Sequence, residues 1–381
     1  MKVAGEGKRG LAALLVVLLL LSAAPCGGVQ QVATLSSAGM AVTVELLDES
    51  LASPWGLAFD ARGRLLISEK GGTLVVFDTA AVQVAARLPL PVAVRDEGQG
   101  GLLDIAVAPG ENSGQLWFTY SKPQGETAVT ALARARLEEG RLTNWQDVLV
   151  TRSPGEGDHH YGSRIAFDGK GFVYFSIGDR GQRENAQDTG SHSGSIIRLA
   201  VDGSLPADNP FLAGGGLAEI YSYGHRNPQG LAYDEVARRL WSIEHGPRGG
   251  DELNLIVKGG NYGWPVVSQG MEYWGPVAAG EATHREGMID PLKVYIPSIA
   301  PGSLLLYRGA AFPRWRGDLF AGALKLRHLN RIVMSGAGRP GGEERLLGEL
   351  GERVRALAES PEGWIYLAAD SGRLYRLRPT N

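Results

Sequence analysis

The sequence predicts an all-β protein, specifically a six-bladed β-propeller built from four-stranded antiparallel sheets. Three observations predict this fold: a short phrase that recurs along the chain, pairs of apolar and aromatic-rich segments, and a high glycine content. Glycine accounts for 54 of 381 residues, about twice its usual share of ~7%. Because glycine supplies the positive φ angles of tight turns, this content indicates a chain with many short reversals.

Each copy of the recurring phrase is an apolar strand, a turn built on Asp, Gly or Pro, and an aromatic-rich strand. Its clearest copies read Leu-Ala-Phe-Asp before Leu-Leu-Ile-Ser, and Ile-Ala-Phe-Asp before Val-Tyr-Phe-Ser. The copies begin at Leu57, Ile105, Ile165, Leu231, Leu304 and Leu357. Intervals of several tens of residues are typical of radially repeated sheets. A further strand follows several copies, so about four strands per unit, repeated six times, predict a closed propeller without open sheet edges.

The segment 41–47 alternates apolar and polar residues, and we expect it to supply the strand that closes the last blade. A two-sheet sandwich would account for the strands as well, but not for the repeated phrase. No linker, charge block or low-complexity stretch divides residues 35–379, which we therefore expect to form a single domain.

The N-terminus has the pattern of a secretory signal peptide, which we place at residues 1–26. Lys2, Lys8 and Arg9 precede an apolar run at 11–24, and this order is typical of export signals. The run is shorter than the roughly 20 residues that a membrane-spanning helix needs, so we expect no transmembrane span in the mature chain. We therefore expect a periplasmic or secreted protein, with lipid attachment through Cys26 as the alternative.

The charge and cysteine content exclude one class of partner and one kind of cross-link. The chain has 38 basic and 41 acidic residues and a net charge of −3, which provides no field for a nucleic-acid backbone, so we expect no nucleic-acid partner. Cys26 is the only cysteine, so the chain cannot form an internal disulfide.

A glycine-rich loop at 155–164 carries two adjacent histidines, His159 and His160, directly before a strand. An imidazole has an ordinary pKa of about 6.5, which suits proton transfer near neutral pH. A zinc site is disfavoured because no His/Cys cluster at metal spacing accompanies the pair. Adjacent side chains of an extended segment point in opposite directions, so we expect only one of the two to face the propeller axis. The alternative for each is a solvated loop residue.

Two further loops carry polar groups. The string 223–230 contains Arg226 and Asn227, and a guanidinium offers forked donors to a carboxylate-bearing ligand; the alternative is a turn that starts the next strand. The string 244–252 is acidic and rich in glycine. It offers the carboxylate and carbonyl oxygens that calcium prefers, although without EF-hand spacing.

Together, several strings resemble the soluble glucose/sorbosone dehydrogenase family and, within it, the bacterial periplasmic aldose sugar dehydrogenases. The strings lie at 97–103, 160–164, 223–230, 244–254, 261–265 and 323–325. The resemblance implies a six-bladed propeller that binds pyrroloquinoline quinone (PQQ) and calcium. It also implies a small aldose substrate, oxidised at its anomeric hydroxyl to a lactone, an external electron acceptor, and a monomer or homodimer.

The resemblance also implies residue roles. His160 resembles the general base, Asp179 the acid that orients it, and Arg226 the cation beside the quinone oxygens. The remaining implied cofactor contacts are Gln99, Asn227, Tyr273, Lys325, Arg353 and Arg355. Gly246 and Pro247 resemble the loop that gives backbone carbonyls to a calcium bridging protein and cofactor. Glu252 and Tyr262 resemble contributors to a second, structural calcium site.

The chain departs from the family at His225, where relatives carry an apolar residue, and at 354–358, which lacks the Asp that follows the second arginine. Two other functions remain as alternatives. A calcium-dependent, lactonase-like hydrolase would need carboxylate or Asn ligands from several blades, whereas this chain offers a cluster of cations. A non-catalytic binding propeller would predict loss of His160 or Arg226, and both are present.

Overall fold

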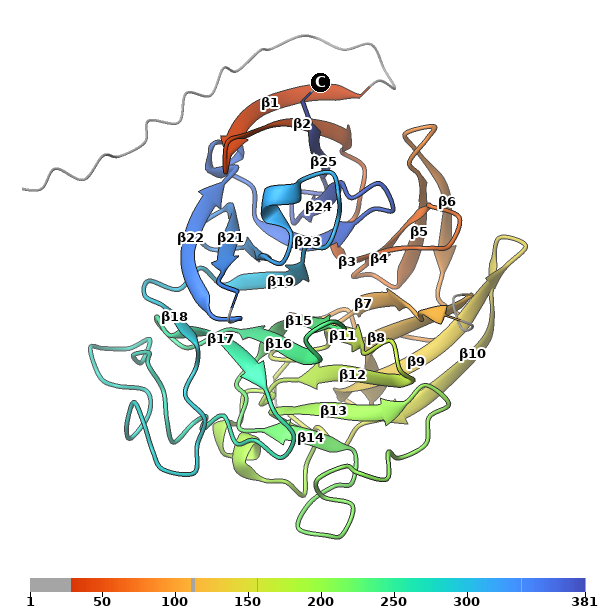
Figure 1. The fold of residues 1–381 in the computed structure, drawn as a ribbon. Coiled ribbons are helices and arrows are strands. Elements are labelled where there is room, and N and C mark those ends of the chain that lie inside the picture. The colour runs from red at the N-terminus through yellow and green to blue at the C-terminus, as the bar shows by residue number, and fades with distance from the viewer. Residues whose placement is uncertain (1–28, 111–113, 156, 337, 381) are drawn as a thin grey trace, which may run out of the picture.

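Six antiparallel sheets arranged around a central axis form a β-propeller, as Figure 1 shows. The computed structural model describes residues 29–380 except 111–113, 156 and 337. The predicted signal peptide at 1–26, with Cys26, lies outside the described residues. No helix within the described ranges is long and apolar enough to cross a membrane. The six-bladed fold predicted from the repeated phrase is confirmed.

Blades 1 to 5 each contain four strands in chain order from the axis outward, whereas blade 6 combines three C-terminal strands with strands from the N-terminus. We number the blades by their position in the chain. Blade 1 contains β3 (Pro54–Phe59), β4 (Leu65–Glu69), β5 (Thr73–Asp78) and β6 (Gln83–Pro89). Blade 2 contains β7 (Leu102–Val107), β8 (Gln115–Gln124), β9 (Thr127–Glu138) and β10 (Arg141–Val150). Blade 3 contains β11 (Ile165–Phe167), β12 (Phe172–Ile177), β13 (Ser195–Ala200) and β14 (Ile220–Tyr223).

The second half of the chain repeats this arrangement. Blade 4 contains β15 (Pro228–Asp234), β16 (Arg239–Glu244), β17 (Asp251–Ile256) and β18 (Lys293–Tyr295). Blade 5 contains β19 (Pro301–Leu306), β20 (Leu319–Ala323), β21 (His328–Met334) and β22 (Pro340–Leu346). Blade 6 contains β23 (Val354–Glu359), β24 (Ile365–Ala369) and β25 (Leu374–Pro379). Three short 3₁₀ turns, η2 (Arg183–Gln187), η3 (Pro313–Trp315) and η4 (Gly348–Leu350), lie in the connections.

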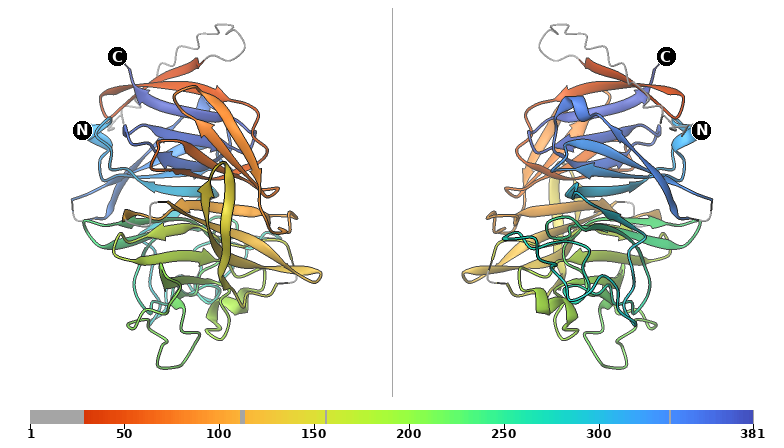
Figure 2. Two further views of the ribbon diagram at one scale, coloured as in Figure 1. Left: turned by 90° about the vertical axis from the view of Figure 1, so that its right-hand side faces the viewer. Right: turned by 90° about the vertical axis from the view of Figure 1, so that its left-hand side faces the viewer.

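The N-terminal strands close the ring. Strand β2 (Met40–Asp48) pairs antiparallel with β25 and places Val44 opposite Leu377. This confirms the expectation that segment 41–47 completes the last blade. Strand β1 (Gln30–Ser37) adds a fifth strand outside β2. Figure 2 shows these two strands, in red, at one edge of the molecule beside the blue C-terminal strands.

Apolar side chains fill the interfaces between neighbouring blades. For example, Leu66 and Leu74 of blade 1 pack with Phe118 and Tyr120 of blade 2 in one buried cluster. Every residue of β4 is buried, because this strand is covered by sheets on both of its faces. A run such as Leu65-Leu66-Ile67 therefore reads as continuously apolar and not as an alternation of apolar and polar residues.

One arginine joins the blades at the axis. Arg164 immediately precedes β11 and is only 5% exposed. Its guanidinium donates to the carbonyl oxygens of Trp55, Gln229, Gly302 and Arg355 and to the carboxylate of Asp104. These five acceptors lie in β3, β15, β19, β23 and β7, the innermost strands of the other five blades. Arg164 thus links its own blade 3 to the innermost strands of the other five blades.

Candidate functional site

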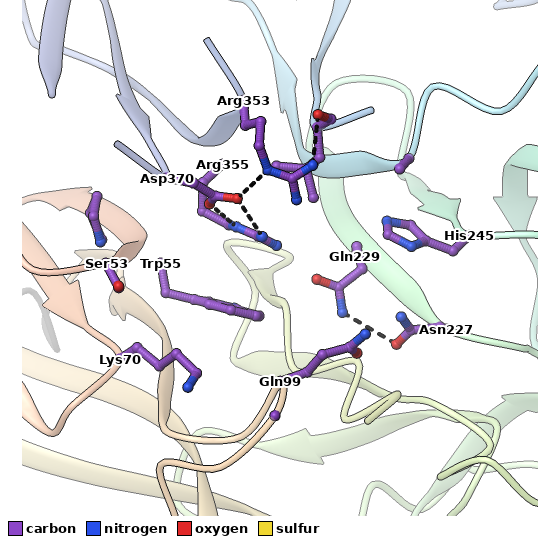
Figure 3. A pocket seen from close by; sticks show the side chains of 14 residues that line it. Ser53, Trp55, Lys70, Gln99, Asn227, Gln229, His245, Arg353, Arg355 and Asp370 are labelled. Carbon is purple, nitrogen blue, oxygen red and sulfur yellow. Dashed lines mark hydrogen bonds and ion pairs between the residues drawn. The ribbon is translucent and has the colours of Figure 1, made fainter. Parts of the chain in front are cut away.

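A cavity of about 420 Å³ opens where the inner strands of the propeller begin. Cavities of this size hold small-molecule ligands. Its lining comes from blades 1, 2, 4, 5 and 6, namely Ser53, Pro54, Trp55, Lys70, Gly98, Gln99, Asn227, Gln229, His245, Ala300, Leu324, Arg353, Arg355 and Asp370. Figure 3 shows Trp55 and Lys70 on one side and Asn227, Gln229 and His245 on the other. Connections from several blades therefore meet at this one face of the propeller.

Cations concentrate in blade 6 and blade 1. Arg353 Nε and Arg355 Nε each lie 2.8 Å from an oxygen of Asp370. Burial raises the pKa of the Asp370 carboxyl, but the two arginines outweigh burial and hold it below its ordinary value. The guanidinium of Arg355 also lies 4.3 Å from the ring centroid of Trp55, within cation–π range. Arg353 and Arg355, both predicted cofactor contacts, line the cavity together with Asp370. Their contact with a cofactor stays a prediction.

The predicted acid–histidine pair is formed. His160 Nδ1 lies 2.7 Å from Asp179 Oδ1, and Asp179 is only 1% exposed. The backbone N–H of Gly181 donates to the same carboxylate oxygen at 2.8 Å. The other oxygen, Oδ2, accepts the indole N–H of Trp264 at 2.8 Å. Since the carboxylate faces Nδ1, the proton of a neutral imidazole resides there and Nε2 has a free lone pair.

Two glycines allow this pair to form. A Cβ at Gly178 would lie 2.3 Å from the carbonyl oxygen of His160, and a Cβ at Gly162 would lie 2.8 Å from the Cα of Ile177. Both distances are too short for any side chain. Glycine at these positions lets the loop 155–164 lie directly against the end of β12, which brings His160 beside Asp179.

The electrostatics favour a neutral histidine. Burial lowers the pKa of His160, the hydrogen bond that its Nδ1–H donates to Asp179 partly restores it, and the charge of Arg226 lowers it again, so the pKa is below its ordinary value. For Asp179, burial raises the pKa of the carboxyl, but His160 and Arg226 together hold it below its ordinary value. Near neutral pH the pair is therefore an ionised carboxylate and a neutral imidazole, the state in which a histidine can accept a proton.

The expectation that His159 and His160 point in opposite directions is wrong. Their ring centroids lie 4.7 Å apart in an edge-to-face contact. The reason is the backbone of His160, whose φ of 54° is left-handed and not extended, so the alternation of an extended segment does not apply. His159 is nevertheless exposed, whereas the His160 side chain is 14% exposed.

Arg226 and Asn227 lie beside this pair. Arg226 Nη1 donates to the carbonyl oxygen of Gly246 at 2.9 Å, while its Nε is buried without a hydrogen-bond partner in the described part of the chain. Asn227 Oδ1 accepts N–H groups from Gly162 and Gln229, so its amide nitrogen remains for a bound molecule. The side chain of Gln99 is also committed in part, because its Oε1 accepts the backbone N–H of His160 at 2.9 Å.

The four predicted metal ligands come together. Gly246, Pro247, Glu252 and Tyr262 all line one small cavity of about 10 Å³, roughly the size that holds one water molecule or ion. Burial, together with the nearby Glu244, raises the pKa of Glu252 to about 8. The Tyr262 hydroxyl is already used, because it donates to the carbonyl of Leu255 and accepts the N–H of Val257. Within the described ranges, no group of three or more His, Cys, Asp or Glu side chains is arranged to hold a metal.

Three predicted cofactor contacts, Arg226, Tyr273 and Lys325, are not among the residues that line the main cavity. Arg226 lines the small cavity beside Gly246. Tyr273 is 67% exposed in the long connection between β17 and β18, and Lys325 is exposed in the turn between β20 and β21. Their contact with a cofactor stays a prediction.

Four lining residues besides Asp370 escaped sequence reasoning: Trp55, Lys70, Gln229 and His245. Burial lowers the pKa of His245 to about 3, and its Nε2–H donates to the carbonyl of Pro301. Gln229 belongs to the string around Arg226 and could have been proposed from it. His245 likewise belongs to the string 244–254 and could have been proposed from it, whereas Trp55 and Lys70 stand at strand ends without a local signal.

The sequence profile of the Glucose / Sorbosone dehydrogenase family matches residues 51–376. The chain belongs to this family. The resemblance seen in the sequence is thereby confirmed.

Members and neighbours of the glucose/sorbosone dehydrogenase family cover most of the chain. The aldose sugar dehydrogenase YliI of Escherichia coli is 39% identical over 353 residues, which span 89% of this chain and 94% of that protein. Quinoprotein glucose dehydrogenase B of Acinetobacter calcoaceticus is 28% identical over 75% of this chain and 76% of its own. The apo-form crystal structure of the soluble E. coli aldose sugar dehydrogenase matches with a TM-score of 0.84 and 35% identity, over 89% of this chain and all of that one. The PQQ-bound aldose sugar dehydrogenase of Streptomyces coelicolor matches with a TM-score of 0.70 and 28% identity, over 88% and 98% of the two chains.

Proposed function

We propose that the protein is a PQQ-dependent aldose sugar dehydrogenase that oxidises the anomeric hydroxyl of an aldose to a lactone. The observation that carries the proposal is the neutral His160, held by Asp179 with Nε2 free. Its backbone N–H donates to Gln99, which lines the cavity together with Lys70, Arg353 and Arg355. Family membership and relatives described as aldose sugar dehydrogenases and as a quinoprotein support it.

The cavity fits PQQ, a planar quinone with three carboxylates. Lys70, Arg353 and Arg355 line the cavity, and guanidinium groups bind carboxylates through paired hydrogen bonds. Among the buried donors without a hydrogen-bond partner in the described part of the chain are Trp55 Nε1, at this cavity, and Arg226 Nε, at the small cavity that shares His245 with it. A buried donor without a partner costs free energy, and a bound anion would remove that cost. When bound, PQQ supplies the hydride acceptor for the sugar C1.

The residues of the chain would transfer the proton and stabilise the developing charge. His160 takes the proton of the anomeric hydroxyl at Nε2, while Asp179 keeps Nδ1 protonated and stabilises the imidazolium that forms. Arg226 places positive charge next to the site where negative charge develops, and Asn227 offers its amide nitrogen there. The buried position of His160 excludes most water from this proton transfer.

We further propose that calcium binds at the small cavity. The Gly246 and Pro247 loop would provide carbonyl oxygens, and Glu252 and Glu244 would provide two buried carboxylates. Burial and, after it, the charge of Glu244 raise the pKa of Glu252. This oxygen-only set matches a hard cation. The Gly246 carbonyl now accepts a hydrogen bond from Arg226, so calcium and Arg226 would share this oxygen.

The two alternative functions, a lactonase-like hydrolase and a non-catalytic binding propeller, account for fewer features of the site. A hydrolase of the lactonase type needs carboxylates free for a metal at the cavity, but Asp370 is held by Arg353 and Arg355. A non-catalytic binding propeller does not explain a buried histidine that burial and Arg226 keep neutral. We also propose export to the periplasm or outside the cell, on the basis of the basic start and the apolar run within residues 1–26.

The test is reconstitution. The purified protein, stripped of metal, should show the absorbance of bound PQQ and dye-linked oxidation of aldoses only after PQQ and calcium are both added. The same PQQ affinity with and without excess chelator would refute the calcium proposal. PQQ bound without aldose oxidation would leave a quinone-binding protein and refute the enzyme.

A further inference from the structure

The side chain of Trp264 contacts both Asp179, the partner of His160, and Arg226. It is 5% exposed, and its Nε1–H donates to Asp179 Oδ2 at 2.8 Å. The other oxygen of the same carboxylate contacts His160 Nδ1 at 2.7 Å. One carboxylate therefore links the indole to the imidazole, and each of its oxygens has a side-chain partner.

The indole ring also contacts two guanidinium groups. The Cζ atoms of Arg226 and Arg183 lie 5.3 Å and 5.4 Å from the ring centroid, within the range of cation–π attraction. Arg183 is itself held by a two-point ion pair with Glu272, at 2.5 Å and 2.8 Å. Trp264 is thus in contact with Asp179 through its N–H and with Arg226 through its ring.

We propose that Trp264 is a positioning residue that holds Asp179 and Arg226 in the arrangement His160 needs to act as a base. Its role in turnover rests on the proposed function, but its effect on His160 is a property of the protein alone. The indole N–H is the essential feature. Without it, Asp179 Oδ2 would be buried without a hydrogen-bond partner, which costs free energy and removes one of the two side-chain contacts that fix the carboxylate beside His160.

The same loss changes the basicity of the imidazole. An Asp179 carboxylate that no longer receives the indole N–H keeps more negative charge on the oxygen facing His160, so the pKa of His160 should rise. The other groups that act on His160 are Arg226, His159 and His245. Arg180 and Arg183 act on Asp179. None of these is changed in Trp264→Phe, so a shift reports the missing N–H.

Trp315 offers a matched control. It is fully buried, and its Nε1–H also donates to a single side-chain oxygen, Ser37 Oγ, at 2.9 Å. It packs among Tyr307, Phe312 and Phe320, away from the cavity. Trp315→Phe therefore removes the same donor from a site that has no role in the proposed chemistry.

The experiment compares Trp264→Phe with Trp315→Phe in the purified full protein. Histidine-selective NMR follows the titration of His160 without cofactor, with its signal assigned by its loss in His160→Gln. Steady-state aldose oxidation after PQQ and calcium addition gives kcat and KM. We expect Trp264→Phe to raise the His160 midpoint by about half a unit and to lower kcat about 10-fold with KM within about twofold. Trp315→Phe should change none of these.

A double variant sharpens the assignment. In an Asp179→Asn background, where the carboxylate is already gone, Trp264→Phe should cause little further loss of kcat. The proposal is overturned if Trp264→Phe leaves both the His160 midpoint and kcat unchanged, or loses only thermal stability as Trp315→Phe does. If the wild-type protein oxidises no aldose, the proposed function fails, and the His160 titration still decides the role of Trp264.

Discussion

Two arginines of this propeller differ in how many of their guanidinium donors are used. One, Arg164, lies at the axis, and the other, Arg226, lines the small cavity beside Gly246. Arg164 is buried and uses Nε, Nη1 and Nη2 to bind acceptors in five blades. Arg226 uses Nη1 for the carbonyls of His245 and Gly246, while its buried Nε has no partner in the described part of the chain. A guanidinium whose donors are all used can only support the protein, whereas one with a buried unpaired donor is prepared for a ligand.

The largest expected effect is the loss of folding stability when Arg164, at the axis, is replaced. Arg164→Met leaves Asp104 and four carbonyls without their donor, and we expect it to lower the free energy of unfolding by about 3–5 kcal/mol. Arg226→Met should cost less than about 1 kcal/mol. Urea denaturation of the two variants measures the difference. A loss below about 1 kcal/mol for Arg164→Met would contradict the structural role; adding Asp104→Asn should recover part of the loss, because it removes the unpaired buried charge.

Next in size is an effect on cofactor binding. Arg226→Lys keeps the charge but loses the planar fork, and we expect quinone affinity to fall about 10- to 100-fold, as for the loss of a hydrogen bond to a charged group. Arg285→Lys is the control, because Arg285 is exposed and pairs only with Glu281. Equal affinities in a PQQ titration of the two variants would show that Arg226 is not a ligand for the quinone.

The smallest expected effect is on pH dependence. Because burial and Arg226 lower the pKa of His160, kcat/KM should be full above that pKa and fall only as pH drops through it, with a midpoint below the ordinary ~6.5. Arg226→Met removes a positive charge and should raise the midpoint by less than about one unit. Arg285→Lys should not move it. A midpoint above 7 in the wild-type profile would be inconsistent with a buried neutral His160.

The comparison of the arginines also shows what sequence can predict. The repeated phrase and the closing segment 41–47 predict the propeller, since both depend on local alternation and turns. His160 and Asp179 were predicted through family resemblance. Arg164 stood in the same string as His160, but its role could not be read there, because its five acceptors come from five blades.

The missed lining residues have the same cause. Asp370 lies in the β24–β25 turn and pairs with Arg353 and Arg355 inside blade 6, because β23 and β24 are antiparallel neighbours that place Val354 opposite Ala369. Trp55 of blade 1 meets Arg355 of blade 6 only because the ring closes. The error over His159 has a different origin, since the left-handed φ of His160 is a backbone state that the sequence Asp-His-His-Tyr does not reveal.

The most direct test of the account is aldose oxidation by reconstituted His160→Ala and His159→Ala. A general base contributes about 10²- to 10⁴-fold, so His160→Ala should lose that factor in kcat while the spectrum of bound PQQ persists. His159→Ala should stay within about threefold of the wild type, because His159 is exposed and has no part in the Asp179 pair. If His159→Ala is the inactive variant, or if both variants keep wild-type turnover, the assignment of His160 as the base is wrong.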